Sequence, residues 1–183
     1  MTVSQNNWVF LGSQVLTTAV GGFSVPSPPT SAPPRNGAFP YYDLLMVRWY
    51  VSMNTNDMLY MTHDLNLLGS SYNSRIFRYS SGSTTPSQTN SVNAGYFPLF
   101  SSATSGGLFG VINICNIPRP STGERTIEFC TMSVNNVGSP PHIQIGQGST
   151  IYSFPITNIV FSTVSGSVLN AGSSMVVFGC NIR

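Results

Sequence analysis

The side chains that could carry acid–base or metal chemistry are few in this 183-residue chain, which has five carboxylates and two histidines. His63 and Asp64 are adjacent, so on an extended strand they point to opposite faces and cannot form a proton relay. His142 follows two prolines, a turn position where histidine is usually solvated or hydrogen-bonded. Asp57 and Asp64 could form a carboxylate pair or a calcium site with neighbouring asparagines, but their spacing does not match an EF-hand loop.

Recognised catalytic motifs are also missing, because the chain has no GxSxG elbow, no phosphate-binding Walker loop and no HExxH pair. Cys115, Cys130 and Cys180 each lie in an apolar run, and their spacing matches no zinc site. We interpret them as three buried, unpaired thiols. The sequence therefore predicts no catalytic residue, no metal ligand and no cofactor, and it indicates that the protein is not an enzyme.

Charged residues make up only 7% of the chain, and all seven basic residues are arginines spread along it. A nucleic-acid surface needs clustered basic residues, and so does an anionic membrane surface, so we expect neither partner. Soluble monomers usually cover about a quarter to a third of their surface with charge. We therefore expect a surface of hydroxyls and amides, or one hidden in an assembly.

The first residues lack the basic and apolar regions of a signal peptide. No run reaches the roughly 18 apolar residues of a membrane span. From these two observations we expect a protein that is made in the cytoplasm.

Short β-branched and aromatic runs bounded by Gly, Pro, Asn and Ser recur, and no stretch has helical periodicity. Ten runs are predicted as strands: 8–11, 14–20, 44–53, 59–65, 75–79, 108–117, 125–134, 143–145, 156–164 and 175–182. Apolar and polar residues alternate in 47–51 and 126–129, which indicates sheets with one buried face. We predict one all-β domain over 1–183, a jelly-roll-like antiparallel β-sandwich.

Two segments are predicted as long loops. Residues 26–40 carry six prolines and are typical of a semi-rigid, extended strap. Residues 80–107 form a long Ser- and Gly-rich loop whose apolar cluster should dock on a neighbouring molecule or on its own domain. The candidate interface residues are Trp8, Phe10, Tyr96, Phe97, Leu99 and Phe100.

Three stretches in order resemble the small jelly-roll virion proteins of tailed bacteriophages, over about half of the chain. They are Tyr41-Tyr42-Asp43-Leu44-Leu45-Met46-Val47-Arg48, then 59–64 with Tyr72, then 156–161 with 169–179. Two places depart from the family pattern: Thr62-His63 precedes Asp64 where Phe-Asn is usual, and Val177-Phe178-Gly179 replaces Leu-Tyr-Gly.

This resemblance implies a virion protein that acts by binding rather than by catalysis. One reading is a capsid decoration (cement) protein, a homotrimer that binds the major capsid protein on the outer surface and stabilises the shell. The alternative is a receptor- or carbohydrate-binding tip of a head or tail fibre, with a host glycan as ligand. A third interpretation is a jelly-roll shell protein that itself builds the capsid. The chain lacks the basic N-terminal arm that is expected of a shell protein in contact with packaged nucleic acid. The resemblance also implies turn or structural roles for Asp64, Gly172 and Ser173.

Overall fold

The computed structural model describes residues 8–26, 39, 42–53, 57–63, 71–79, 85–94, 96–103, 106–117, 124–135, 142–151, 156 and 158–181. These residues form strands and contain no α-helix. The strands are β1 (Val9–Val15), β2 (Gly22–Pro26), β3 (Leu44–Met53), β4 (Asp57–His63), β5 (Ser71–Tyr79), β6 (Ser87–Ala94), β7 (Phe97–Ala103), β8 (Gly106–Cys115), β9 (Glu124–Asn135), β10 (Ile143–Ile151), β11 (Asn158–Thr163) and β12 (Ser174–Cys180).

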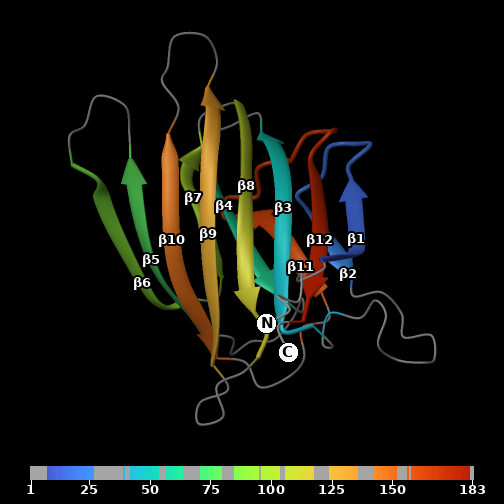
Figure 1. The fold of residues 1–183 in the computed structure, drawn as a ribbon. Helices are drawn as coiled ribbons and strands as arrows, with labels where there is room; N and C mark the ends of the chain where they lie inside the picture. Colours follow the sequence, from blue (N-terminus) through green and yellow to red (C-terminus); the bar gives the residue numbers. More distant parts are fainter. Residues whose placement is uncertain are drawn as a thin grey trace.

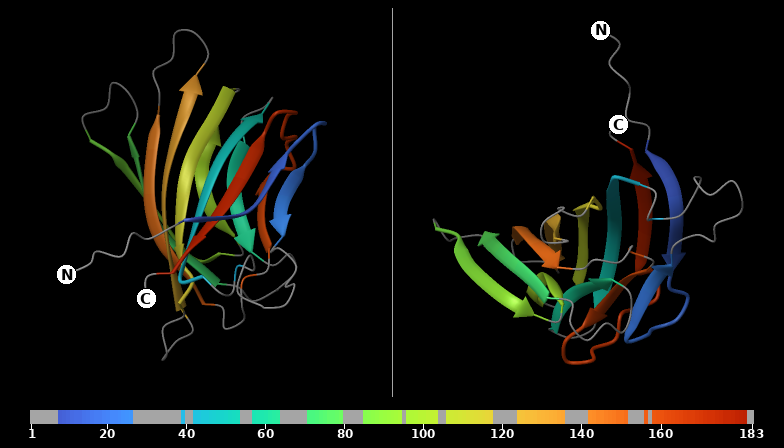
Figure 2. Two further views of the ribbon diagram at one scale, coloured as in Figure 1. Left: turned by 45° about the vertical axis from the view of Figure 1, so that its right-hand side comes forward. Right: turned by 90° about the horizontal axis from the view of Figure 1, so that it is seen from below.

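The strands form two antiparallel sheets that pack face to face (Figure 1). The larger sheet has eight strands in the order β1-β12-β3-β8-β9-β10-β5-β6, and the smaller has four in the order β2-β11-β4-β7. The right-hand view of Figure 2 shows the two layers from their ends. The predicted all-β antiparallel sandwich is therefore confirmed.

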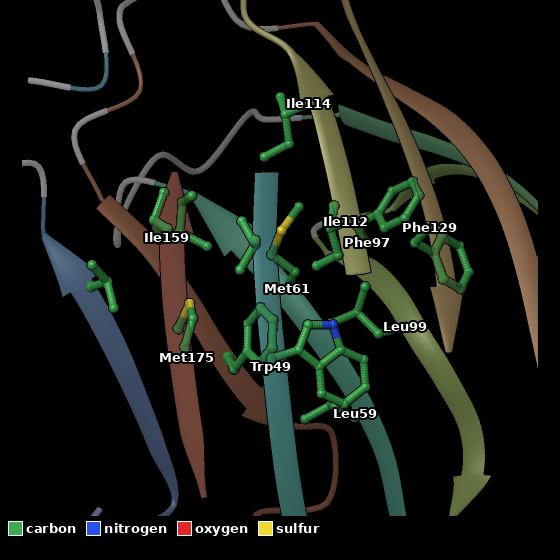
Figure 3. Close-up of a cluster of buried hydrophobic side chains, with 14 of the residues drawn as sticks. Trp49, Leu59, Met61, Phe97, Leu99, Ile112, Ile114, Phe129, Ile159 and Met175 are labelled. Carbon is green, nitrogen blue, oxygen red and sulfur yellow. The ribbon is translucent and has the colours of Figure 1, made fainter. Parts of the chain in front are cut away.

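The alternation of side chains along β3 shows how the sequence forms this sandwich. Val47, Trp49 and Val51 are buried, whereas Arg48 and Tyr50 between them are exposed, as the alternating pattern predicts. Side chains of this kind from both sheets meet between the layers in one hydrophobic core (Figure 3). The other face of the larger sheet is left for solvent or partners.

Glycines in β8 and β10 allow large rings to lie flat against the inner face of the larger sheet. A Cβ at Gly146 would overlap the Phe129 ring, and a Cβ at Gly110 would lie 2.8 Å from the Trp49 ring. Glycine inside a strand often marks such a close approach. The glycine-rich residues 146–149, whose composition indicates a hairpin turn, therefore belong to strand β10.

The prediction of a long loop over 80–107 is wrong, because this segment contains β6 and β7. Phe97, Leu99 and Phe100 are buried in the core of this chain, so their side chains are not on an exposed loop. β7 is an edge strand of the smaller sheet, where a proline is tolerated. β6 is an edge strand of the larger sheet, and its residues 87–90 are polar and exposed, so no hydrophobic alternation indicates a strand there.

The predicted strand over 14–20 is also displaced, since β1 ends at Val15 and β2 begins at Gly22. A Cβ at Gly22 would come within 2.9 Å of the Phe161 carbonyl oxygen, so this glycine permits close strand pairing with β11. Most of the predicted proline strap, 26–40, lies outside the described residues. Phe39, which the structure does describe, is fully buried.

Of the three residues with implied turn roles, two lie in the turn before β12. Gly172 has a φ of +85°, a left-handed conformation that favours glycine. Ser173 is buried, and its hydroxyl accepts a hydrogen bond of 3.1 Å from the backbone N–H of Ser52. Asp64 lies outside the described residues.

Candidate functional site

The outer face of the eight-stranded sheet carries exposed apolar side chains, although no other described element covers it. Figure 1 views this face, with β9, β8 and β3 in front of the smaller sheet. The register aligns two rows of outward side chains across β3, β8, β9, β10 and β5. We call their exposed or half-buried apolar members the apolar band: Tyr50, Phe77, Tyr79, Phe109, Val111, Cys130, Met132, Ile143 and Ile145.

Two shallow hollows lie along the apolar band. The first, of about 410 Å³, is bordered by Arg48, Phe109 and Met132. The second, of about 460 Å³, is bordered by Phe77 and Ile145. Val111 and Cys130 line both hollows, so the two adjoin across β8 and β9. Contiguous exposed apolar surface of this kind is typical of a contact site for another molecule.

A third hollow, of about 510 Å³, lies where β9, β10, β5 and β6 run side by side, and its lining is mostly polar. We call its outward polar side chains the polar corner: Asn73, Arg75, Asn90, Glu124, Thr126, Glu128, Gln147 and Ser149. One arginine and two glutamates give the polar corner a formal charge of −1. It shares Glu128 and Gln147 with the second apolar hollow, so the outer face changes from apolar to polar without a break.

The polar corner is not among the candidate residues predicted from the sequence. Polar residues two positions apart do mark it, at 73 and 75, at 126 and 128, and at 147 and 149. That spacing predicts outward-facing positions on a strand. It does not say which strands are neighbours, and the polar corner exists only because β9, β10 and β5 pair in this register.

The carboxylate of Asp57 caps the turn that follows β11. Its carboxylate accepts hydrogen bonds from the backbone N–H groups of Met58 at 2.7 Å, Ser165 at 3.1 Å and Ser167 at 3.2 Å. Burial raises the pKa of this carboxyl, but hydrogen bonds from the Ser167 side chain and from these backbone groups outweigh it. The net pKa lies below its ordinary value, so Asp57 is a charged cap that holds the turn after β11.

His142 is half-buried at the start of β10, and its backbone is anchored to β9. Its carbonyl accepts a 2.9 Å hydrogen bond from the N–H of Ser133, and its own N–H donates to the Ser133 hydroxyl at 3.0 Å. Burial, and then the positive charge of Arg78, lower the pKa of the imidazole. The imidazole Nδ1 is buried and has no hydrogen-bond partner among the described residues, so at this atom the side chain is neither solvated nor hydrogen-bonded as the turn position predicts.

The prediction of three buried thiols is wrong for Cys130. The thiols are unpaired, but only Cys180 is buried, whereas Cys115 is half-buried and Cys130 is exposed on the outer face. The apolar run around Cys130 belongs to a strand with one buried and one exposed face, so the thiol at an outward position is left in the apolar band.

The remaining predicted interface residues differ in their surroundings. Trp8 and Phe10 are 41% and 59% exposed at the β1 edge, and the Phe10 ring meets the Phe178 ring edge-on at 6.3 Å. Tyr96 is half-buried, with its ring 4.9 Å from that of Tyr60 on its own chain. Trp8 and Phe10 are therefore accessible to a partner, whereas Tyr96 packs largely on its own sandwich.

Within the residues that the structure describes, no group of three His, Cys, Asp or Glu side chains could hold a metal ion. The same part of the chain contains no helix of the length and hydrophobicity needed to cross a membrane.

Comparison with known proteins identifies no family for this chain. No family model matches the chain, and no curated protein matches it. A VP2 subviral particle of infectious bursal disease virus is similar at 12% identity and a TM-score of 0.15, over 97% of this chain and 37% of that one. A Gt strain structure of the same virus has 10% identity and a TM-score of 0.17, over 97% and 41%. This chain thus spans about two fifths of those proteins, and likeness this low carries no argument about fold or function.

Proposed function

We propose that this chain is a non-enzymatic structural protein of a virion, a capsid decoration protein that binds the outer capsid surface as a homotrimer and stabilises the shell. The observation that carries the proposal is the apolar band on the uncovered face of the larger sheet. Burying apolar surface contributes about 25 cal/mol per Å² to association, before the cost of immobilising the partners. A permanent trimer would bury more than about 2,000 Å² in total.

Two further features support contacts of this kind. Charged residues are scarce, so few ion pairs are available to hold an assembly, and apolar and hydroxyl contacts must dominate. Trp8 and Phe10 add exposed aromatic surface at the β1 edge, next to β12. The resemblance to small phage virion proteins agrees with a protein that works by contact.

The proposal is tested by the mass of the purified chain, measured by light scattering on a size-exclusion column at low and at high salt. We expect a trimer that resists dilution and salt, because screening acts on charges and not on apolar contacts. The double variant Phe109→Ser with Ile145→Ser should dissociate. The matched control, Val164→Ser with Val168→Ser, changes two exposed valines outside the band and should remain trimeric.

A monomeric wild-type chain, or a trimer unaffected by Phe109→Ser with Ile145→Ser, would overturn the assignment of the band. Binding to capsids assembled without the chain should likewise depend only weakly on ionic strength. A strong loss of capsid binding at high salt would count against apolar contacts.

The second candidate function is a receptor- or carbohydrate-binding tip of a head or tail fibre. The polar corner favours it, because amide, carboxylate and guanidinium groups are suited to sugar hydroxyls. A tip module would bind host glycans and would show no affinity for capsids.

A further inference from the structure

Four planar polar side chains stand in one row across four neighbouring strands of the polar corner. The register pairs Arg75 with Asn90 on one side and with Gln147 on the other, and it pairs Gln147 with Glu128. Directly opposed side chains on neighbouring strands have Cβ atoms about 5 Å apart. Amide, guanidinium, amide and carboxylate groups are therefore presented side by side, within reach of one small ligand.

Three of these four groups are available to a ligand, whereas the amide oxygen of Asn90 already accepts a 3.0 Å hydrogen bond from the Gln88 side chain. Arg75, Gln147 and Glu128 are exposed, and within the described residues no hydrogen bond or ion pair joins their side chains to another residue. The guanidinium only donates, the carboxylate only accepts, and the amide does both. A ligand that matches this mixture must donate and accept at closely spaced positions, as vicinal hydroxyl groups do.

The hollow has the size and the floor of a small-molecule site. Its volume of about 510 Å³ lies within the range of roughly 300–1,000 Å³ that such sites occupy. Its floor includes the buried Ser149 and Gly148. The adjoining apolar hollow, lined by Phe77 and Ile145, offers an aromatic and aliphatic surface beside the polar row. Sugar rings have this same division between hydroxyl groups and a C–H face.

We propose that the polar corner binds a neutral saccharide, with its hydroxyls bonded by Arg75, Gln147 and Glu128 and its C–H face against Phe77. The formal charge of −1 disfavours sialylated, sulfated or phosphorylated sugars, because their anionic groups meet two glutamates for one arginine. This site is separate from the trimer contact proposed above. The apolar band contacts protein, and the polar corner stays open at the β5–β6 end of the sheet.

The test uses the purified full chain on an array of neutral oligosaccharides built from glucose, galactose, mannose or N-acetylglucosamine, with sialylated and sulfated counterparts. We expect binding to neutral members only. The neutral oligosaccharide that binds best is then titrated by calorimetry against wild-type and variant chains. Absence of binding at millimolar oligosaccharide, or a preference for anionic sugars, would overturn the proposal.

The variants locate the site. Arg75→Gln and Gln147→Ala should each weaken binding by about tenfold, the effect of losing one charge-assisted or two neutral hydrogen bonds. Arg48→Gln is the matched control, since it removes an exposed arginine from the same face outside the polar corner and should leave the affinity unchanged. If Arg75→Gln loses its thermal unfolding transition, Glu128→Gln serves instead. Equal affinity in the folded corner variants and in Arg48→Gln would overturn the site. Both outcomes are independent of whether the chain is a trimer.

Discussion

The two faces of the eight-stranded sheet carry similar side chains in very different surroundings. On the inner face Trp49, Ile112 and Phe129 are buried beneath the smaller sheet, whereas on the outer face Phe109 and Ile145 are 38% and 48% exposed. The same strands supply both sets, with alternate residues pointing to opposite faces. The difference is therefore one of coverage and not of composition.

This difference separates the energetics of folding from those of association. Inner side chains leave water when the chain folds, so their burial already contributes to the stability of the monomer. Outer side chains still contact water, and their burial is available only to a partner. Substitutions on the inner face should change the free energy of unfolding, and substitutions on the outer face should change binding.

The largest expected effect is that of Phe97→Ala in β7. Phe97 is fully buried, with its ring edge-on to that of Phe129 at 5.4 Å. Removing a buried phenylalanine typically costs about 3–5 kcal/mol of unfolding free energy. Phe109→Ala on the outer face is the control and should cost far less, as measured by urea denaturation. Equal losses for the two variants would remove the distinction between the core and the outer face of the larger sheet.

A methyl group added on the inner face should cost somewhat less. At Gly146 the new Cβ would overlap the Phe129 ring, whereas at Gly21 it would meet no atom within 4 Å. Overpacking of a core typically costs about 1–3 kcal/mol, and we expect Gly146→Ala near the upper end. Gly21→Ala should be nearly neutral in the same denaturation experiment. A stable Gly146→Ala variant would show that the Phe129 ring can move aside.

The sequence predicts the fold well where strands have one buried face, because hydrophobic alternation is a local signal. Leu44–Met53 is predicted with its observed bounds and with the correct buried residues. The signal fails for β6 at a sheet edge, where the described side chains of residues 87–90 are polar and exposed. Hydrophobic alternation also fails to identify β7, because a proline between large apolar residues is typical of a loop. The proline is compatible with a strand only because β7 lies at the edge of its sheet, which the sequence does not show.

The candidate site was much less predictable. Residues 128 and 147 come from the consecutive strands β9 and β10, whereas residue 75 comes from the distant strand β5, and only the antiparallel register places the three in one row. Trp8 and Phe10 were predicted as candidate interface residues, and both are exposed. Burial of Phe97 and Phe100 on their own domain was one of the two alternatives that the sequence left open. The sequence could not decide between them, because the burial depends on the smaller sheet covering one face of the larger.

A smaller effect on the free energy of unfolding is expected when the buried carboxylate of Asp57 is replaced. Because the pKa of Asp57 is lower in the folded chain, its charge stabilises the fold above the unfolded value of about 3.9. That stabilisation is lost as the pH falls through the folded-state pKa. Asp57→Asn should lower the free energy of unfolding by about 1–2 kcal/mol at neutral pH. It should also weaken the decrease of this free energy at acid pH, as measured by urea denaturation between neutral pH and acid. Glu128→Gln, at an exposed position, is the control and should leave the pH dependence of the unfolding free energy unchanged.

The smallest effect on stability is expected for substitution of a thiol, and chemical labelling of the thiols compares exposed and buried positions directly. Cys130 is exposed in the apolar band, whereas Cys180 is 2% exposed. Cys130→Ser should change the unfolding free energy by less than about 0.5 kcal/mol, as is usual at the surface.

In the native chain a thiol reagent such as iodoacetamide should modify Cys130 quickly and Cys180 only after unfolding, as peptide mass mapping would show. If the apolar band contacts a partner, the assembled protein should protect Cys130. Rapid labelling of Cys130 in an intact trimer would place the subunit contact elsewhere and leave the outer face open.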